Sequence, residues 1–280
     1  MSAGARGRTG LLLVPAALMF VVLFLLPMLW FFVRTLLIEV PPSSVPGLFA
    51  QVLASRPMQV AMLTTLWISV LVTAVALLLG YPIAFYLATR RGLRFSMVMF
   101  CIVVPYFTSV IVRTYSWMVL LGRNGVVNQV LMETGLIARP LPLLYNSFGI
   151  VVGMVYVLLP YMVLTLYAAI KAIDPSLPRA ARALGGGRFY VFRRVYLPLS
   201  WHGVVSGSLI VLILGIGFFI TPALMGGSGD VMVAMLVERS VEIMLDWQTA
   251  AVMSLVLLAA TLMLYALYSR VTDLRRMMGA

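Results

Sequence analysis

The amino-acid sequence predicts an all-α membrane protein with six transmembrane helices, and two observations support this fold class. Hydrophobic residues make up 63% of the 280 residues and charged residues only 10%, whereas soluble proteins average about 45–50% and about 25%. The apolar residues also gather in runs that reach the roughly 20 residues needed to cross a bilayer as a helix. A soluble globule could not bury this much apolar surface, and intrinsic disorder is excluded for the same reason.

Six apolar runs define the predicted spans. The first, 11–33, lies between Arg8 and Arg34. It exceeds the roughly 7–15 apolar residues of a signal peptide and no small-residue cleavage site follows, so we expect a retained signal-anchor helix. The exterior connections are too short to form domains of their own, and we expect one transmembrane domain over residues 1–280. The other five spans are expected at about 59–88, 96–121, 146–170, 203–224 and 249–268.

Basic residues are distributed unequally between the two faces of this arrangement. Six spans leave both termini on one side, and that side carries fourteen of the 20 Lys and Arg residues and only two acids. The opposite side carries six basic residues and six acids. Lys and Arg are enriched in cytoplasmic loops, so we expect both termini in the cytoplasm. The net charge of +12 therefore indicates membrane topology rather than a nucleic-acid surface.

Residues that could carry chemistry are scarce. Cys101 stands alone inside an apolar run, His202 is the single histidine, and neither a P-loop nor a G-x-G-x-x-G motif is present. A disulfide, a thiolate metal cluster or a Ser/His/Asp triad has almost no material here. We therefore predict no catalytic residue, metal site or cofactor on this chain, and expect any energy source on another chain.

The 171–200 segment, the longest cytoplasmic loop, predicts a helix, a glycine turn and a second helix. Asp174 suits an N-cap and Pro175 the first helical position. Gly185–Gly187 would end the first helix, and Pro198 would end the second. The loop thus has the local signals of a compact helix-turn-helix.

One face of the first loop helix is small and apolar, because its members recur at three- and four-residue spacing. It consists of Leu177, Ala180, Ala181 and Leu184, with Arg179 and Arg182 beside it. Such a face could fit a groove on another protein. The alternative is a solvated basic loop that lies on anionic lipid headgroups.

Three features on the exterior half admit two interpretations each. Gly217 and Pro222 near the end of the fifth span indicate a broken, pathway-lining segment, or close packing through small residues. Arg113 in the third span is a functional candidate, or a side chain that reaches the membrane surface. The amphipathic segment 231–246 predicts an interfacial or re-entrant helix, or a lid with no ligand role.

The 177–198 stretch resembles the EAA loop of binding-protein-dependent ABC importer permeases. Ala180, Ala181, Gly185 and Pro198 keep the family spacing, while Arg179 stands where the family usually has Glu. Most of residues 59–269 shares the resemblance, and several patches are similar to the spermidine/putrescine branch: 80–84, 105–109, 113–117, 125–128, 155–163, 225–227 and 246–247.

The resemblance implies a type I ABC importer permease fold in the bacterial inner membrane. It also implies two ATPase subunits that bind ATP and Mg, a second permease subunit that is a paralogue, and an extracytoplasmic substrate-binding protein. The 174–185 helix would then be the coupling helix that the ATPases move. The implied coupling residues are Leu177, Arg179, Ala180, Ala181, Leu184, Gly185 and Pro198.

A polyamine is a flexible polycation, so its pathway should offer aromatic faces and acids. Candidate acids on the exterior include Glu133 and Glu242. The candidate pathway residues are Tyr106, Arg113, Tyr115, Trp117, Phe218, Phe219, Asp230, Glu238, Asp246 and Trp247.

Other function classes remain open. The chain could serve an importer of another small solute, such as an aminophosphonate or iron. A proton- or ion-driven secondary carrier would need acids inside the membrane, and none lies in the central part of the predicted spans. A membrane-bound enzyme would need convergent nucleophile, acid or metal groups, for which one His and one Cys are poor material.

Overall fold

The computed structural model describes residues 14–41 and 43–277, and every regular element in these ranges is helical. The chain divides into two compact units, Met1–Ser55 with Val237–Leu255 and Arg56–Leu236 with Val256–Ala280. Four helices are long and apolar enough to cross a membrane, or six elements if each of two bent pairs is one span. A multi-pass membrane protein follows from these lengths and compositions.

The first unit contains an exposed apolar helix. Val14–Ile38 is continuous and comprises η1 (Val21–Leu25), α2 (Leu26–Val33) and η2 (Arg34–Ile38). Its mean hydropathy is 2.6, and no residue of its most apolar window is buried. A helix that is apolar all round suits a lipid environment. The predicted span therefore continues to Ile38, and its start at 11–13 lies outside the described residues.

The rest of the first unit is a short helix and the segment around 237–255. α3 (Val45–Ala54) follows the exposed helix, with Pro46 in its first turn. At the other segment, Phe31 meets Trp247 edge to face, with ring centroids 6.2 Å apart. Arg34 and Glu39 form an exposed ion pair of 3.1 Å, which contributes little because water screens it.

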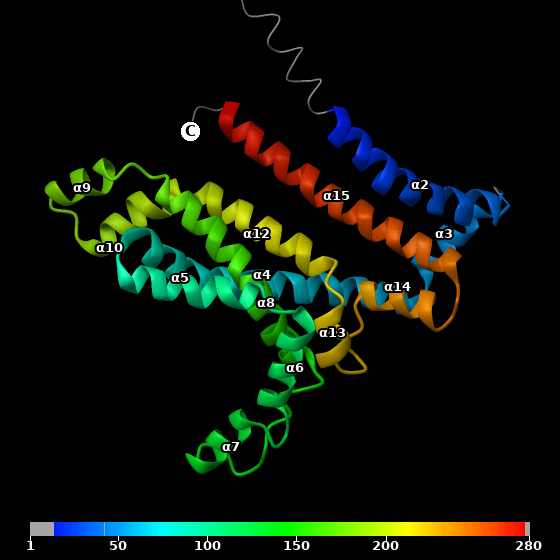
Figure 1. The fold of residues 1–280 in the computed structure, drawn as a ribbon, viewed down its shortest axis with the longest axis horizontal. Coiled ribbons are helices and arrows are strands. Elements are labelled where there is room, and N and C mark those ends of the chain that lie inside the picture. Colours follow the sequence, from blue (N-terminus) through cyan, green and yellow to red (C-terminus); the bar gives the residue numbers. More distant parts are fainter. Residues whose placement is uncertain (1–13, 42, 278–280) are drawn as a thin grey trace, which may run out of the picture. The chain divides into compact units, whose positions relative to one another are not determined.

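The second unit is built around three long helices: α4 (Arg56–Thr89), α8 (Ser147–Lys171) and α12 (Trp201–Ile216), which pack against one another. Figure 1 shows them as the blue-green, green and yellow ribbons at the centre of this unit. They correspond to the predicted spans 59–88, 146–170 and the first part of 203–224. Asn146 caps α8, since its Oδ1 accepts a 3.0 Å hydrogen bond from Gly149 N.

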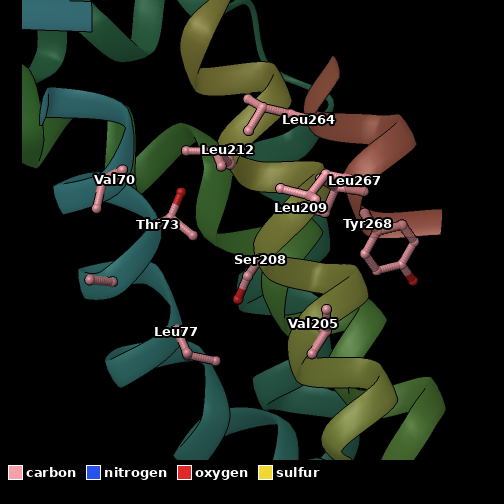
Figure 2. Close-up of a pocket in the computed structure, with 11 residues that line it drawn as sticks. Val70, Thr73, Leu77, Val205, Ser208, Leu209, Leu212, Leu264, Leu267 and Tyr268 are labelled. Atoms are coloured by element: carbon pink, nitrogen blue, oxygen red, sulfur yellow. The ribbon is translucent and has the colours of Figure 1, made fainter. Parts of the chain in front are cut away.

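An apolar groove of about 440 Å³ runs between α4, α12 and the last part of α15 (Trp247–Met277). Figure 2 shows Leu77, Leu209, Leu212 and Leu264 among its walls. The hydroxyl of Tyr268, at one end, lies 2.6 Å from the Ser206 hydroxyl. Walls of this kind offer no charge to hold a polar solute, so the groove is not a candidate substrate site.

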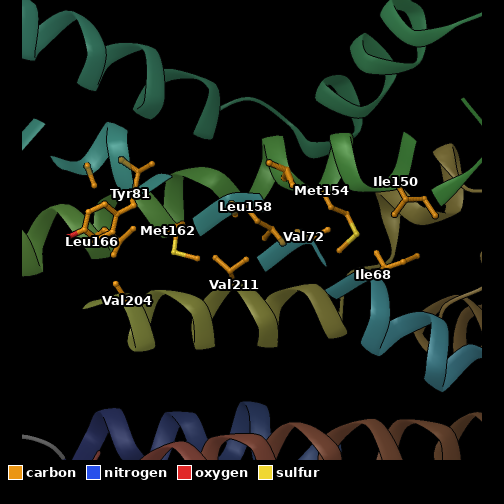
Figure 3. Packing of buried hydrophobic residues seen from close by; sticks show 14 of the residues in the cluster. Ile68, Val72, Tyr81, Ile150, Met154, Leu158, Met162, Leu166, Val204 and Val211 are labelled. Carbon is orange, nitrogen blue, oxygen red and sulfur yellow. The ribbon is translucent and has the colours of Figure 1, made fainter. Parts of the chain in front are cut away.

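The core of the second unit is a row of buried aliphatic and methionine side chains. Ile68 and Val72 of α4 face Met154, Leu158 and Met162 of α8, as Figure 3 shows. All five are at most 1% exposed. Such a core resembles soluble-protein packing, although most of the surface around it is apolar.

Glycines allow these helices to approach closely. A Cβ added at Gly80 would lie 3.0 Å from Met162 Cγ, and one at Gly207 would lie 3.0 Å from Met162 Sδ. At Gly203 an added Cβ would overlap the Cβ of Ala169. Small residues at helix interfaces are the usual means of close packing in membranes.

Two predicted spans are not straight, which corrects the expectation for both. The 96–121 span is divided into α5 (Leu93–Tyr106) and α6 (Val110–Leu121), and the chain turns by 104° between Leu93–Tyr106 and Val110–Glu133. The cause is local: Thr108 Oγ1 donates to the Pro105 carbonyl at 2.6 Å, and Ser109 leaves helical geometry with ψ 138°. An apolar run with one proline does not reveal such a break.

The fifth span ends earlier than predicted. α12 stops at Ile216, and α13 (Ile220–Met225) follows a break at 217–219. The break that Gly217 indicates is therefore present. A second bend of 61° separates Arg188–Leu199 from Trp201–Ile216, so the cytoplasmic loop joins α12 at an angle.

The difference between Gly203 and Gly207 is testable. Replacement of Gly203 by Ala forces the added methyl against the rigid Ala169 side chain, while the Gly207 methyl meets the flexible end of Met162. We expect Gly203→Ala to destabilise the chain by about 1–3 kcal/mol, as overpacking does. Gly207→Ala, the matched control, should cost clearly less. Thermal unfolding in detergent compares the two, and equal melting temperatures would contradict the packing assignment.

Candidate functional site

The first candidate site is the cytoplasmic loop helix α9 (Ser176–Ala183). Asp174 Oδ1 accepts a 2.8 Å hydrogen bond from Ser176 N, at the first residue of the helix, although Asp174 lies one residue before the N-cap position predicted for it. Pro175, however, stands at the N-cap rather than at the first helical position. The two hydrogen bonds from Ser176 lower the pKa of the Asp174 carboxyl, which stays charged next to the positive end of the helix.

A glycine turn ends α9. Gly185 has φ +86°, a conformation that side chains other than glycine rarely adopt. Gly186 N donates to the Ala181 carbonyl at 3.0 Å and Gly185 N to the Arg182 carbonyl at 3.0 Å. These bonds form a Schellman-type end, which fixes the direction in which the chain leaves the helix.

The apolar face of α9 has no cover. Leu184 is 89% exposed and Leu177 is 47% exposed, and Ala180 is exposed as well. Ala181 is partly exposed, while Pro178 is the buried residue of this helix. Exposed aliphatic side chains on a charged loop are typical of a docking surface.

Two of the predicted coupling residues, Arg179 and Pro198, have no feature in the structure that indicates a docking role. Arg179 Nε donates to the Pro175 carbonyl at 2.9 Å, so its side chain folds back on its own helix. Pro198 is exposed within α11 (Leu197–Leu199). The coupling role of both residues stays a prediction.

Aromatic contacts fasten the loop to α4. After α10 (Arg188–Val191), the short π-helix η3 (Phe192–Tyr196) places two rings against Phe85. The centroid of Phe85 lies 5.4 Å from that of Phe192 and 4.9 Å from that of Tyr196, both edge to face. Tyr81 of α4 also meets Phe192, at 5.7 Å. These ring contacts join the cytoplasmic loop to α4.

The second candidate site is the cavity at the bend between α5 and α6. It measures about 370 Å³, and Pro105, Thr108, Arg113, Trp117 and Tyr156 are among its walls. Trp117 and Tyr156 pack edge to face, with centroids 5.6 Å apart. Two of the predicted pathway residues, Arg113 and Trp117, therefore come together here.

Further tyrosines lie next to this cavity. The hydroxyl of Tyr161 donates to that of Tyr106 at 3.4 Å, and their rings are 5.4 Å apart. Tyr156 and Tyr161 belong to α8 and were not among the predicted pathway residues, because their proximity to α6 depends on the bend. Tyr115, in contrast, is 53% exposed and does not line the cavity.

Arg113 is the one charged residue that is buried in the described part of the chain. It is 8% exposed, and its Nε and Nη1 atoms have no hydrogen-bond partner there. Its neighbour Thr114 is satisfied, with its hydroxyl 3.0 Å from that of Thr221 in α13. The sequence could identify Arg113 as unusual, but not as unpaired.

The remaining pathway candidates lie elsewhere. Phe218 and Phe219 occupy the break before α13, half-buried, and Phe218 packs on the helix core. Asp230 accepts hydrogen bonds from Gly227 N at 3.1 Å and from the Ser147 hydroxyl. Its carboxylate thus stabilises backbone, and its pathway role stays a prediction.

The same holds for two residues of the first unit. Asp246 caps α15, since its Oδ1 accepts from Thr249 N at 3.0 Å. Trp247 is 46% exposed beside Phe31. Their pathway roles also stay predictions.

Glu238 and Glu242 form a carboxyl pair one turn apart on α14 (Val233–Glu242). Desolvation, repulsion by Glu242 and a hydrogen bond to it raise the pKa of the Glu238 carboxyl. Glu133, at the end of α7 (Val126–Glu133), is exposed. The raised pKa means that Glu238 holds its proton more tightly than an ordinary Glu side chain does.

Solved structures share the architecture of this chain. The chain matches a bacterial ABC transporter that imports the acidic polysaccharide alginate with TM-score 0.70 at 18% identity, covering 96% of this chain and 97% of that one. It matches the MetNI methionine ABC transporter with TM-score 0.58 at 18% identity, covering 78% of this chain and 98% of that one. At these identities the likeness establishes the fold: that of ABC importer membrane subunits.

Residues 76–274 match the family described as "Binding-protein-dependent transport system inner membrane component", and the chain belongs to that family. It is thus a non-catalytic permease subunit of an ABC importer. It is 33% identical to the spermidine/putrescine transport system permease protein PotB of Haemophilus influenzae, over 75% of this chain and 73% of that protein. It is 30% identical to PotB of Escherichia coli (strain K12), over 76% of this chain and 78% of that protein. The inner membrane ABC transporter permease protein YdcU of Escherichia coli is 33% identical over 60% and 57%.

The Glu238 and Glu242 pair predicts a pH dependence of α14. The folded chain holds the Glu238 proton more tightly than the unfolded chain does, so protonation of Glu238 stabilises the folded state. This contribution is fully present below the ordinary Glu pKa. It is lost as pH rises through the raised pKa. Amide hydrogen exchange over 233–242, corrected for intrinsic rates, should show stronger protection at pH 4 than at pH 7. Glu238→Gln should remove the difference and Glu133→Gln, the control, should retain it. Equal protection at both pH values in the native chain would refute the pairing.

Proposed function

We propose that this chain is one of two permease subunits of an ATP-driven polyamine importer. The observation that carries the substrate class is the identity of 33% over 75% of the chain to a spermidine/putrescine permease. The protein lies in the bacterial inner membrane with both termini in the cytoplasm, as the distribution of Lys and Arg favours. The second permease subunit is a paralogue, and a binding protein delivers the solute on the outer face.

The uncovered face of α9 supports the coupling mechanism. Two ATPase subunits, which bind ATP and Mg, dock on the loop and cover Leu177 and Leu184, which are 47% and 89% exposed in this chain. Closure of the ATPases pushes α9. Because Phe192 and Tyr196 pack on Phe85, the push reaches α4 and changes the access of the pathway, as in other two-state switches.

Aromatic side chains beside the α5–α6 bend support passage of a polycation. Trp117, Tyr156, Tyr106 and Tyr161 offer ring faces to ammonium groups, and cation–π contacts of this kind are worth about 0.5–2 kcal/mol each. The Glu238 and Glu242 pair supplies negative charge.

One observation favours a second candidate solute. Arg113 is buried and unpaired at the cavity. Its guanidinium would bind the phosphonate group of a solute and would repel the ammonium group of a polyamine. An importer of an aminophosphonate is therefore the alternative, and the two solutes differ in the sign of the charge that meets Arg113.

Uptake into proteoliposomes with the complete transporter separates these candidates. The vesicles contain ATP, and the outside medium contains the binding protein with radiolabelled spermidine, putrescine, 2-aminoethylphosphonate or ferric ion. We expect ATP-dependent accumulation of spermidine or putrescine only. Vesicles loaded with ADP provide the control. Accumulation of the phosphonate or of iron, with no polyamine uptake, would contradict the proposed substrate class.

The coupling role of the α9 turn has a matched pair of variants. Gly185→Glu places a side chain at φ +86°, next to the docking face, whereas Gly187→Glu places it at φ −64° in open space. We expect Gly185→Glu to lower uptake at least about tenfold, the equivalent of about 1.4 kcal/mol, with unchanged affinity for the binding protein. Gly187→Glu should transport much more. Normal uptake by Gly185→Glu at normal expression would exclude a coupling role for this turn.

A further inference from the structure

Arg113 presents an unbalanced charge inside the protein. The side chain is 8% exposed, and its Nε and Nη1 donors are buried without a hydrogen-bond partner in the described part of the chain. Arginine does not lose its proton in proteins. An unpaired charge in such surroundings is strongly destabilising, and nearly all buried polar groups have partners. The geometry thus requires a counter-charge.

The described part of this chain does not supply that counter-charge. The ion pair it contains joins Arg34 to Glu39, at 3.1 Å. Asp230 is engaged by Gly227 and Ser147, and Glu238 by Glu242. The acid that balances Arg113 therefore belongs to another molecule.

The groups that line the cavity beside Arg113 indicate which type of acid could pair with it. The aliphatic hydroxyl groups in its walls already donate to carbonyl groups, that of Thr108 to Pro105 O at 2.6 Å and that of Ser116 to Val112 O at 2.8 Å. Trp117 and Tyr156 add neutral donors, so the guanidinium is the charged donor of the cavity. A planar carboxylate can accept two parallel N–H bonds from it.

The surface beside the cavity indicates where the carboxylate comes from. α6 has an exposed apolar side, on which Ile111, Val112 and Val119 are 48%, 59% and 70% exposed, and Val112 also lines the cavity. Lipid could cover these aliphatic side chains, but it would leave the charge of Arg113 unbalanced in the membrane. A protein surface that is apolar with one acid satisfies both requirements.

We propose that the exposed side of α6 binds the second permease subunit, and that Arg113 receives a carboxylate from that subunit. The inference rests on the part of the proposed function in which two permease subunits form the pathway. The ion pair gives the interface its register, because a single buried charge pair tolerates few relative positions.

An Arg113→Met variant tests the proposal through effects of opposite sign. Methionine has a similar length and removes the unbalanced charge, so the full chain purified alone should gain stability, with its melting temperature raised by about 2–4 °C. Assembly with the second permease, measured by co-purification from the same membrane, should fall at least about tenfold. Arg113→Lys should keep partial assembly, since it retains charge without the bidentate geometry. Arg139→Met, at an exposed arginine, is the control and should change neither quantity.

A charge-reversal screen identifies the acid. In an Arg113→Glu background, each membrane-facing acid of the second permease is replaced by Arg, and recovery of co-purification by one combination supports the proposal. Native assembly of Arg113→Met, or a fall in its stability when alone, would overturn the proposal. So would an Arg113 requirement that appears only when phosphatidylglycerol replaces phosphatidylcholine in the vesicles, since the acid would then be a lipid phosphate. If assembly needs Arg113 but the native transporter moves no polyamine, the proposed substrate fails and this inference stands.

Discussion

The close approach of α4, α8 and α12 is the constraint on which the rest of the second unit depends. Gly203 lies so near Ala169 that no larger residue fits without displacement, and Gly80 and Gly207 both lie against Met162. In a membrane, contacts of this type replace the hydrophobic effect as the cause of helix association. With the three backbones fixed, Tyr81 reaches Ser200 at 2.8 Å and the loop aromatics reach Phe85. The position of the cytoplasmic helix therefore depends on packing inside the membrane.

The two candidate sites each lack a partner, but for different physical reasons. α9 exposes aliphatic side chains where water is the neighbour, so a partner would gain from their burial. Arg113 buries most of a charged side chain without an ion-pair partner in the described residues, so a partner would gain from its neutralisation. Both sites are incomplete in the single chain, as expected for one subunit of an importer with several subunits.

Sequence reasoning identified the features that depend on local or bulk properties. Apolar runs located α4 and α8 within a few residues, and Asp174 with Gly185 marked where α9 starts and stops. It failed where tertiary contacts decide. The break at 107–109 depends on the Thr108 hydroxyl as well as on Pro105, and an apolar run with one proline also occurs in continuous helices such as α4. The sequence also does not reveal that the Asp230 oxygens accept hydrogen bonds from Gly227 and Ser147, because Ser147 lies far away in the sequence.

The 89% exposed Leu184 has a consequence for the cell as well as for transport. An aliphatic side chain at the tip of a loop is the kind of feature by which chaperones and membrane proteases recognise unfinished proteins. A permease that has not met its ATPase would display this leucine, and an assembled one would not. The same residue would then report the completeness of the complex, and degradation of orphan subunits would keep the subunit ratio balanced.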